Sequence, residues 1–216
     1  MNIMRRITFC PFLLLLSLAV NAQNVTVDNY YNQETKKDAN GKKVDYHYLW
    51  NDKEWTGFSI FGEAFKRNGA KELSVLKEAP TLANLKSTAV YLIVDPDHVA
   101  DNPNPNYMNE TEAKAIAKWV KNGGVLLLMG NDKENADLEH FNILAAKFGF
   151  TFNNDLILFV KDDQHFDDGG LATENIPPFE TAKHIFIKNA SSIAISGKVK
   201  PILKTADGKV AMITVK

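Results

Sequence analysis

Polar side chains stand at two places where a predicted buried strand ends. Asp95 and Asp97 follow one such strand, and Asn131 and Asp132 follow the next. Ligands in open α/β sheets bind beyond the carboxyl ends of the strands. If the two strands are neighbours, these four side chains converge on one crevice, where their oxygens suit a hard cation or sugar hydroxyls. The alternative is structural, with Asp95 and Asn131 capping the segments that follow them.

An aromatic segment, residues 46–59, supplies the second set of candidates. It places His47, Trp50 and Asp52 close together in the chain. Sugar sites favour aromatic faces that cover apolar ring hydrogens, beside polar groups that fix the hydroxyls. We therefore include these three residues in the candidate ligand site. The alternative is an aromatic plug over one edge of the sheet.

Signatures of catalysis and of cofactor binding are missing from the sequence. It contains no Gly-x-Ser-x-Gly nucleophile motif, phosphate loop or dinucleotide fingerprint, and its one cysteine, Cys10, lies near the start of the chain. The acidic run 162–170 does not have the spacing of an EF-hand loop. We predict no catalytic residue, no metal site and no cofactor.

Residues 1–22 have the composition of a signal peptide. Arg5 and Arg6 precede the apolar stretch 12–20, and a cleavage site after Ala22 fits the small-residue pattern. The apolar stretch is too short to cross a bilayer comfortably. The sequence therefore predicts an exported, periplasmic or extracellular protein that keeps no stable membrane span after cleavage.

The composition is that of a globular protein of 216 residues, with 45% hydrophobic and 24% charged residues. The formal charge of −1 provides no basic surface for nucleic acid. We expect residues 23–216 to form a single domain.

The candidate site must be positioned by a parallel sheet. The runs 89–94 and 125–129 are almost entirely apolar, which is typical of central parallel strands covered on both faces. Between them, residues 109–122 have helical periodicity and begin with the capping-box pair Asn109 and Glu112. A strand, a helical crossover and a second strand form a βαβ unit. The predicted fold class is α/β, with three layers and a mainly parallel, open, flavodoxin-like sheet.

The same patterns predict the remaining elements. Turn signals and periodicity indicate helices at 55–68 and 136–148, polar loops at 34–43 and 161–170, strands at 25–27, 73–76, 150–152, 156–160, 185–188 and 193–196, and a hairpin of 199–203 with 210–215. Doubly wound domains usually continue past such a strand with another helix. Either the last strand lies at the sheet edge, or this chain lacks a C-terminal strand and helix that its relatives have.

Several motifs together resemble the C-terminal accessory domain of bacterial unsaturated rhamnogalacturonyl hydrolases. They are Tyr46–Trp50 with Gly57–Ser59, Tyr91–Asp97, Pro105–Tyr107, Trp119–Asp132 and Glu139–Asn142. That domain is similar to class I glutamine-amidotransferase-like domains, including those of gliding and intraflagellar-transport proteins. The resemblance covers about residues 25–216.

Two departures limit what the resemblance implies about activity. Those hydrolases carry their catalytic acids on a separate helical barrel, for which this chain has no room, and amidotransferases use a cysteine that the mature chain lacks. The resemblance implies an exported, non-catalytic accessory module in pectin or rhamnogalacturonan degradation that binds an oligosaccharide or a polysaccharide-degrading hydrolase. The alternatives are a glycoside hydrolase acting on unsaturated rhamnogalacturonyl oligosaccharides and a protein–protein scaffold.

Overall fold

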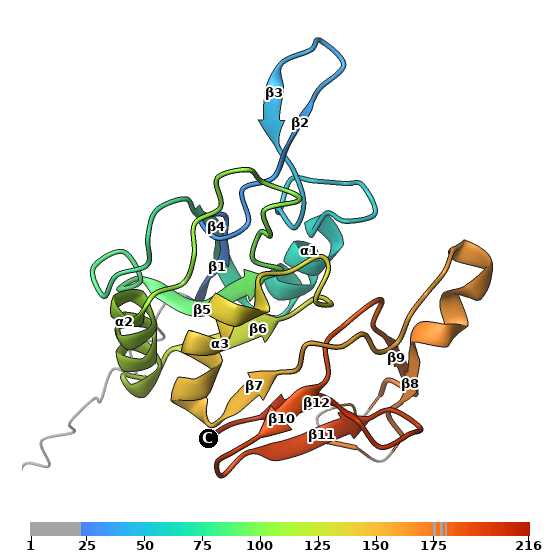
Figure 1. Cartoon of the computed structure of the whole chain (residues 1–216). Helices are drawn as coiled ribbons and strands as arrows, with labels where there is room; N and C mark the ends of the chain where they lie inside the picture. Colours follow the sequence, from blue (N-terminus) through green and yellow to red (C-terminus); the bar gives the residue numbers. More distant parts are fainter. Residues whose placement is uncertain (1–22, 175, 178, 180) are drawn as a thin grey trace, which may run out of the picture.

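A four-stranded parallel sheet forms the centre of the molecule (Figure 1). The computed structural model describes residues 23–216 apart from 175, 178 and 180. The strand order is β4-β1-β5-β6, and every neighbouring pair is parallel. The strands are β1 (Gln23–Asp28), β4 (Ala70–Leu76), β5 (Thr88–Val94) and β6 (Val125–Met129).

Helices cover both faces of this sheet, as the continuous apolar runs predicted. Helix α1 (Ser59–Arg67) packs on one face, while α2 (Glu110–Lys121) and α3 (Leu138–Ala145) pack on the other. Side chains of β5 alternate between the two cores: Tyr91 and Ile93 face α2 and α3, and Leu92 and Val94 face α1. The predicted adjacency of 89–94 and 125–129 is confirmed, with Val90 opposite Val125 and Val94 opposite Met129.

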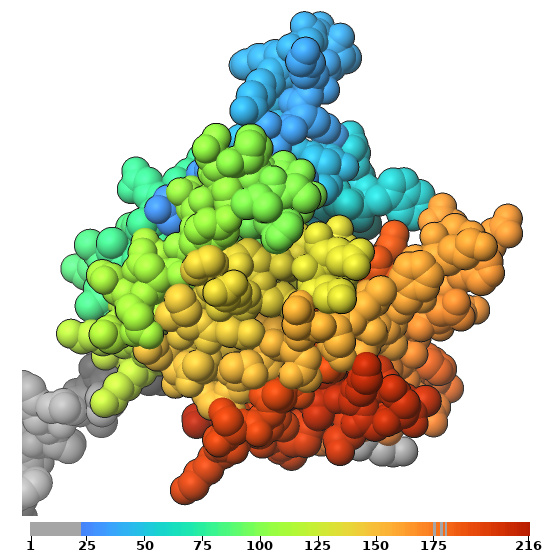
Figure 2. Space-filling view, viewed as in Figure 1, coloured from blue at the N-terminus to red at the C-terminus, as the bar shows by residue number. Residues whose placement is uncertain are grey.

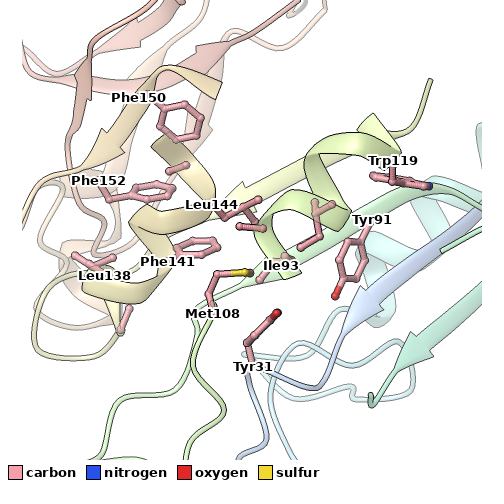
Figure 3. Close-up of a cluster of buried hydrophobic side chains, with 14 of the residues drawn as sticks. Tyr31, Tyr91, Ile93, Met108, Trp119, Leu138, Phe141, Leu144, Phe150 and Phe152 are labelled. Carbon is pink, nitrogen blue, oxygen red and sulfur yellow. The ribbon is translucent and has the colours of Figure 1, made fainter. Parts of the chain in front are cut away.

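The larger core lies under α2 and α3 (Figure 3). Phe141 stacks on Phe152 of β7 (Phe150–Phe152), with ring centroids 5.1 Å apart, and Tyr91 meets Trp119 edge to face. Trp119 lies so close to Gly124 that a Cβ there would come within 2.4 Å of the indole. Gly124 is therefore required for the turn that brings the chain from α2 into β6.

The start of α2 agrees with the sequence prediction in detail. The Asn109 side chain accepts hydrogen bonds from the backbone N–H groups of Thr111 and Glu112, and the Glu112 carboxylate accepts one from Asn109 N–H. The Glu112 carboxylate also accepts a 2.7 Å hydrogen bond from the Tyr31 hydroxyl. The cap thus joins the helix to the segment that follows β1.

The C-terminal part of the chain forms two-stranded antiparallel pairs. They are β7 with β10 (Ile193–Ile195), β8 (Gly170–Ala172) with β9 (His184–Phe186), and β11 (Lys200–Lys204) with β12 (Val210–Thr214). Two short 3₁₀ helices, η1 (Ala146–Phe148) and η2 (Asp163–Gly169), accompany them. The predicted hairpin around Asp207 and Gly208 is confirmed by the β11–β12 pair.

Other predicted elements differ from the structure. Residues 156–160 are not a strand, since only Ile157 forms an isolated bridge, with Ala190. The segment 34–43 is part of a hairpin of β2 (Thr35–Lys37) and β3 (Lys43–Asp45), which the lysines and the lack of an apolar face concealed. Helix α1 begins at Ser59 rather than near Trp55, because residues 54–57 form a turn.

The predicted signal peptide and Cys10 lie outside the described residues. Among residues 23–216, apart from the three positions already named, no helix has the length and apolar character needed to cross a membrane.

Candidate functional site

Asp95 lies at the carboxyl end of β5, where the sequence placed the crevice. Its backbone is in the left-handed region, with φ 48°, which is uncommon for a residue with a side chain. One carboxylate oxygen, Oδ2, accepts hydrogen bonds from the Tyr48 hydroxyl (2.7 Å) and from Asn131 Nδ2 (3.2 Å). The predicted meeting of the β5 and β6 ends is therefore confirmed for Asp95 and Asn131.

His47 is connected to the same edge of the sheet by Tyr48, the next residue in the chain. Its Nδ1 lies 2.7 Å from Glu34 Oε1, and the next residue, Tyr48, bonds to Asp95. Both His47 and Tyr48 have positive φ, at 65° and 52°. This left-handed pair turns the 46–59 segment so that it covers the end of β5.

Asp97 holds two loops together at this edge. Its Oδ2 accepts hydrogen bonds from Gln33 N–H (2.9 Å) and Asn102 Nδ2 (2.7 Å). Nearby, the Asn32 side chain donates a 2.7 Å hydrogen bond to the Asp95 carbonyl. The second carboxylate oxygen of Asp95, that of Asp97 and the amide oxygen of Asn32 are all buried without a hydrogen-bond partner.

Burial governs the electrostatics of this edge. It raises the pKa of Asp95 to about 6, against the opposing effect of the hydrogen bonds from Tyr48 and Asn131. Burial also raises the pKa of Asp97, and the negative charges of Glu34 and Asp101 act in the same direction on both groups. The edge therefore carries buried acids that hold protons more tightly than exposed ones.

Three of the predicted site residues have other structural roles. Asp132 accepts hydrogen bonds from Glu134 N–H (2.9 Å) and Asn135 Nδ2 (2.7 Å), which closes its own loop. Trp50 lies between α1 and the sheet, where its indole N–H donates a 2.7 Å hydrogen bond to the Ser74 carbonyl. Asp52 binds Glu54 N–H (2.9 Å) and lies against Gly57.

An exposed aromatic residue next to this segment was not among the predicted site residues. Gly57 N–H donates a 2.9 Å hydrogen bond to the Glu54 carbonyl, which closes a turn with Trp55 at its corner. Trp55 is 95% exposed, and Ile60, on the outer face of α1, is 84% exposed. Both line a hollow of about 550 Å³, together with Lys53, Glu54, Gly57 and Ser59. We call Trp55, Ile60 and this hollow the Trp55 surface.

Sequence reasoning found part of this region and missed the rest. It selected the aromatic segment, but the pattern does not tell which of its two tryptophans packs against the core and which is exposed. Glu34, Asn32 and Tyr48 come from loops whose path no periodicity predicts. Within the described part of the chain, no three His, Cys, Asp or Glu side chains are grouped so as to hold a metal ion.

Comparisons with known proteins show the fold alone. No family model matches the chain, and no curated protein matches it. One similar solved structure is the "mmIFT52 N-terminal domain", with a TM-score of 0.60 and 14% sequence identity over 86% of this chain and 74% of that one. At this identity the likeness extends to the α/β architecture and not to activity.

Two predictions are corrected by these comparisons. The assignment to the accessory domain of unsaturated rhamnogalacturonyl hydrolases is wrong, because no family model supports it and the similar structure named above is an intraflagellar transport domain. The predicted periplasmic or extracellular location is wrong on the same comparison, since that domain does not come from an exported bacterial protein. The chain is an α/β protein built on a four-stranded parallel sheet.

Proposed function

We propose that this chain is a non-catalytic binding module whose partner is a protein and that the Trp55 surface makes the contact. The exposure of Trp55 is the observation that carries the proposal. Trp55 stands at the corner of a turn, and it shares a hollow with exposed Ile60 and several polar residues. Exposed apolar residues with a polar rim are typical of protein-binding surfaces, and tryptophan is enriched among their hot spots.

Burial of Trp55 would supply a large part of the binding energy. An aromatic side chain buries about 150–250 Å². At roughly 25 cal/mol per Å² this corresponds to about 4–6 kcal/mol before the costs of association. The backbone of the surrounding turn is held by the hydrogen bonds from Gly57 N–H to the Glu54 carbonyl and from Glu54 N–H to Asp52, so binding must order the indole side chain but not the turn.

The carboxyl edge of the sheet supports the non-catalytic part of the proposal. Each of Asp95 and Asp97 uses one oxygen to hold loops and keeps the other buried. A general acid or a nucleophile needs its reacting atom within reach of a substrate. Asp95 and Asp97 therefore act here as structural residues.

For the fold, we infer a flavodoxin-like or class I amidotransferase-like arrangement of the sheet and its helices. The likeness to the mmIFT52 domain, with a TM-score of 0.60, supports the α/β part of this description. The strand order and the helices on both faces are compatible with it.

Carbohydrate binding is the second candidate, and the same indole favours it. The exposed face of Trp55 lies beside Lys53, Glu54 and Ser59, whose polar groups suit sugar hydroxyls. In this case the stacking residue is Trp55 and not the predicted Trp50, whose indole is engaged with Ser74.

Tryptophan fluorescence of the full chain tests both candidates. Trp119 is buried and Trp50 is packed against α1, so changes at the exposed indole report on Trp55. Because Lys53 lines the hollow and the lysines of the β2–β3 hairpin lie nearby, we expect poly-L-glutamate, as a model acidic polypeptide, to shift the emission to shorter wavelength, and neutral oligosaccharides to have no effect. Trp55→Ala should abolish the response, and Trp119→Phe should keep it. A response to oligosaccharides alone would favour the second candidate, and no response to either would contradict both.

A further inference from the structure

An acidic arm extends from the C-terminal part of the chain. It comprises residues 161–170, which include η2, and residues 184–187, which include β9. Between 161 and 170 there are four aspartates and one lysine, a net charge of −3 with His165 neutral. Among the described residues, Asp163, Asp167 and Asp168 form no ion pair.

The arm also presents two stacked phenylalanines to solvent. The rings of Phe166 and Phe186 lie 4.5 Å apart at an angle of 27°. They remain 51% and 47% exposed. An exposed aromatic pair bordered by carboxylates suits a partner that carries both apolar and cationic groups.

Such groups occur next to the Trp55 surface of the same chain. The β2–β3 hairpin, residues 35–45, has four lysines and two aspartates, a net charge of +2. Lys37 and Lys43 lie directly opposite each other in the register, which is unfavourable for the isolated hairpin. Lys36 bonds to Glu54 at 2.5 Å, which connects the hairpin to the turn that carries Trp55.

The hairpin and the arm are separate projections of one molecule. Figure 2 shows the hairpin at the top and the arm at the right-hand edge, with the rest of the surface between them. Trp55 is 95% exposed, so the rest of the chain covers little of its surface. Among the described residues, no ion pair or ring contact joins the hairpin lysines or Trp55 to the arm, so these complementary groups are available to a second molecule.

We propose that two copies of this chain associate, with the Trp55 surface and hairpin lysines of one copy bound to the acidic arm of the other. This self-association rests on the proposed function, and it identifies the partner protein as a second copy of the same chain. Trp55 packs against the Phe166–Phe186 pair, while Lys37, Lys42 and Lys43 face Asp163, Asp167 and Asp168. Each contact joins two different surfaces. Two molecules form a closed dimer if each binds the arm of the other, and otherwise the association continues into a linear assembly of many molecules.

Sedimentation velocity of the full chain tests this association directly. We expect a concentration-dependent mass above that of the 24.1 kDa monomer, which corresponds either to a dimer or to a larger assembly of molecules. Salt should weaken the association, because the Debye length falls from about 10 Å at 0.1 M to about 3 Å at 1 M. A monomer at every protein concentration in low salt would overturn the proposal.

Charge reversal provides a sharper test. Reversing the hairpin (Lys37→Glu with Lys43→Glu) or the arm (Asp167→Lys with Asp168→Lys) should each weaken self-association by roughly tenfold or more. A mixture of the two variants should associate again, since each reversed surface then meets its complement. Failure of the mixture to associate would contradict the pairing.

A control variant tests whether the charge effect is specific, and one combination of results separates this proposal from the proposed function. Lys118→Glu with Lys121→Glu changes the net charge as the hairpin variant does, but on the exposed face of α2, and should leave association unchanged. Equal weakening by this control would show a nonspecific charge effect and overturn the pairing. If the chain is monomeric yet Trp55 still responds to poly-L-glutamate, the proposed function stands and only the second copy is wrong.

Discussion

Two stacked phenylalanine pairs illustrate how differently the two parts of this chain are built. Phe141 and Phe152 stack between α3 and β7, and both rings are buried in the larger core. Phe166 and Phe186 stack on the acidic arm with about half of each residue in solvent. The same side-chain contact therefore contributes to folding in one place and is available for binding in the other.

This difference follows from the sheets that support the two pairs. The four-stranded parallel sheet has helices on both faces, so its side chains are removed from water on both sides. The arm has only the two-stranded β8–β9 pair and the 3₁₀ helix η2. A two-stranded pair cannot bury an aromatic residue on both sides, so the phenylalanines remain exposed.

The largest expected effect comes from opening the buried pair. Phe141→Ala should lower the free energy of unfolding by about 3–5 kcal/mol, because it removes buried apolar surface and leaves a cavity against Phe152. Urea denaturation followed by circular dichroism measures the change. If this variant does not fold, Phe141→Leu, which keeps most of the apolar volume, should show a smaller loss. A loss below about 1 kcal/mol for Phe141→Ala would contradict the assignment of Phe141 to the core.

A pH-dependent effect is expected at the edge of the sheet. Burial raises the pKa of Asp95 from its ordinary value of 3.8 to about 6, so the folded state binds this proton more tightly than the unfolded state. The stability from this group is fully present below about pH 4 and is lost as the pH rises through 6. A shift of about two units corresponds to roughly 3 kcal/mol. Asp28, whose pKa burial also raises to about 6, acts in the same direction.

Asp95→Asn tests this effect at a single oxygen. The amide can keep its oxygen toward Tyr48 and Asn131 and replace only the unpartnered oxygen. We expect the free energy of unfolding at pH 8 to increase by about 1–3 kcal/mol and its decline between pH 4 and pH 7 to become shallower. Asp207 provides a control, because the hydrogen bond from Thr205 lowers the pKa of its carboxyl group, whereas burial raises the pKa of Asp95. Asp207→Asn should leave the decline between pH 4 and pH 7 in place, and an unchanged decline in Asp95→Asn would contradict the role of burial.

The sequence predicted the sheet better than its surroundings, for physical reasons. Residues 89–94 and 125–129 are apolar on both faces, and Asn109 with Glu112 marks a helix start through local hydrogen bonds, so these elements could be recognised from neighbours in the chain. The convergence of Asp95 and Asn131 was predicted on the condition that these two strands are neighbours, and the structure fulfils that condition. By contrast, Tyr48 and Glu34 reach the edge through left-handed loop residues. The packing of Trp50, but not Trp55, against the smaller core depends on the tertiary position of α1.

The smallest effect on stability is expected in the exposed pair. Phe166→Ala removes a ring that already contacts water on about half its surface, so the free energy of unfolding should change by less than about 1 kcal/mol. The same substitution removes the aromatic face that we place against Trp55 of a second copy, and should therefore reduce self-association in sedimentation velocity. A loss of stability as large as that of Phe141→Ala would mean that the arm belongs to the folding core. Unchanged stability together with unchanged association would place the binding surface away from the arm, since an exposed ring that stabilises neither the fold nor a complex has no part in the contact proposed for it.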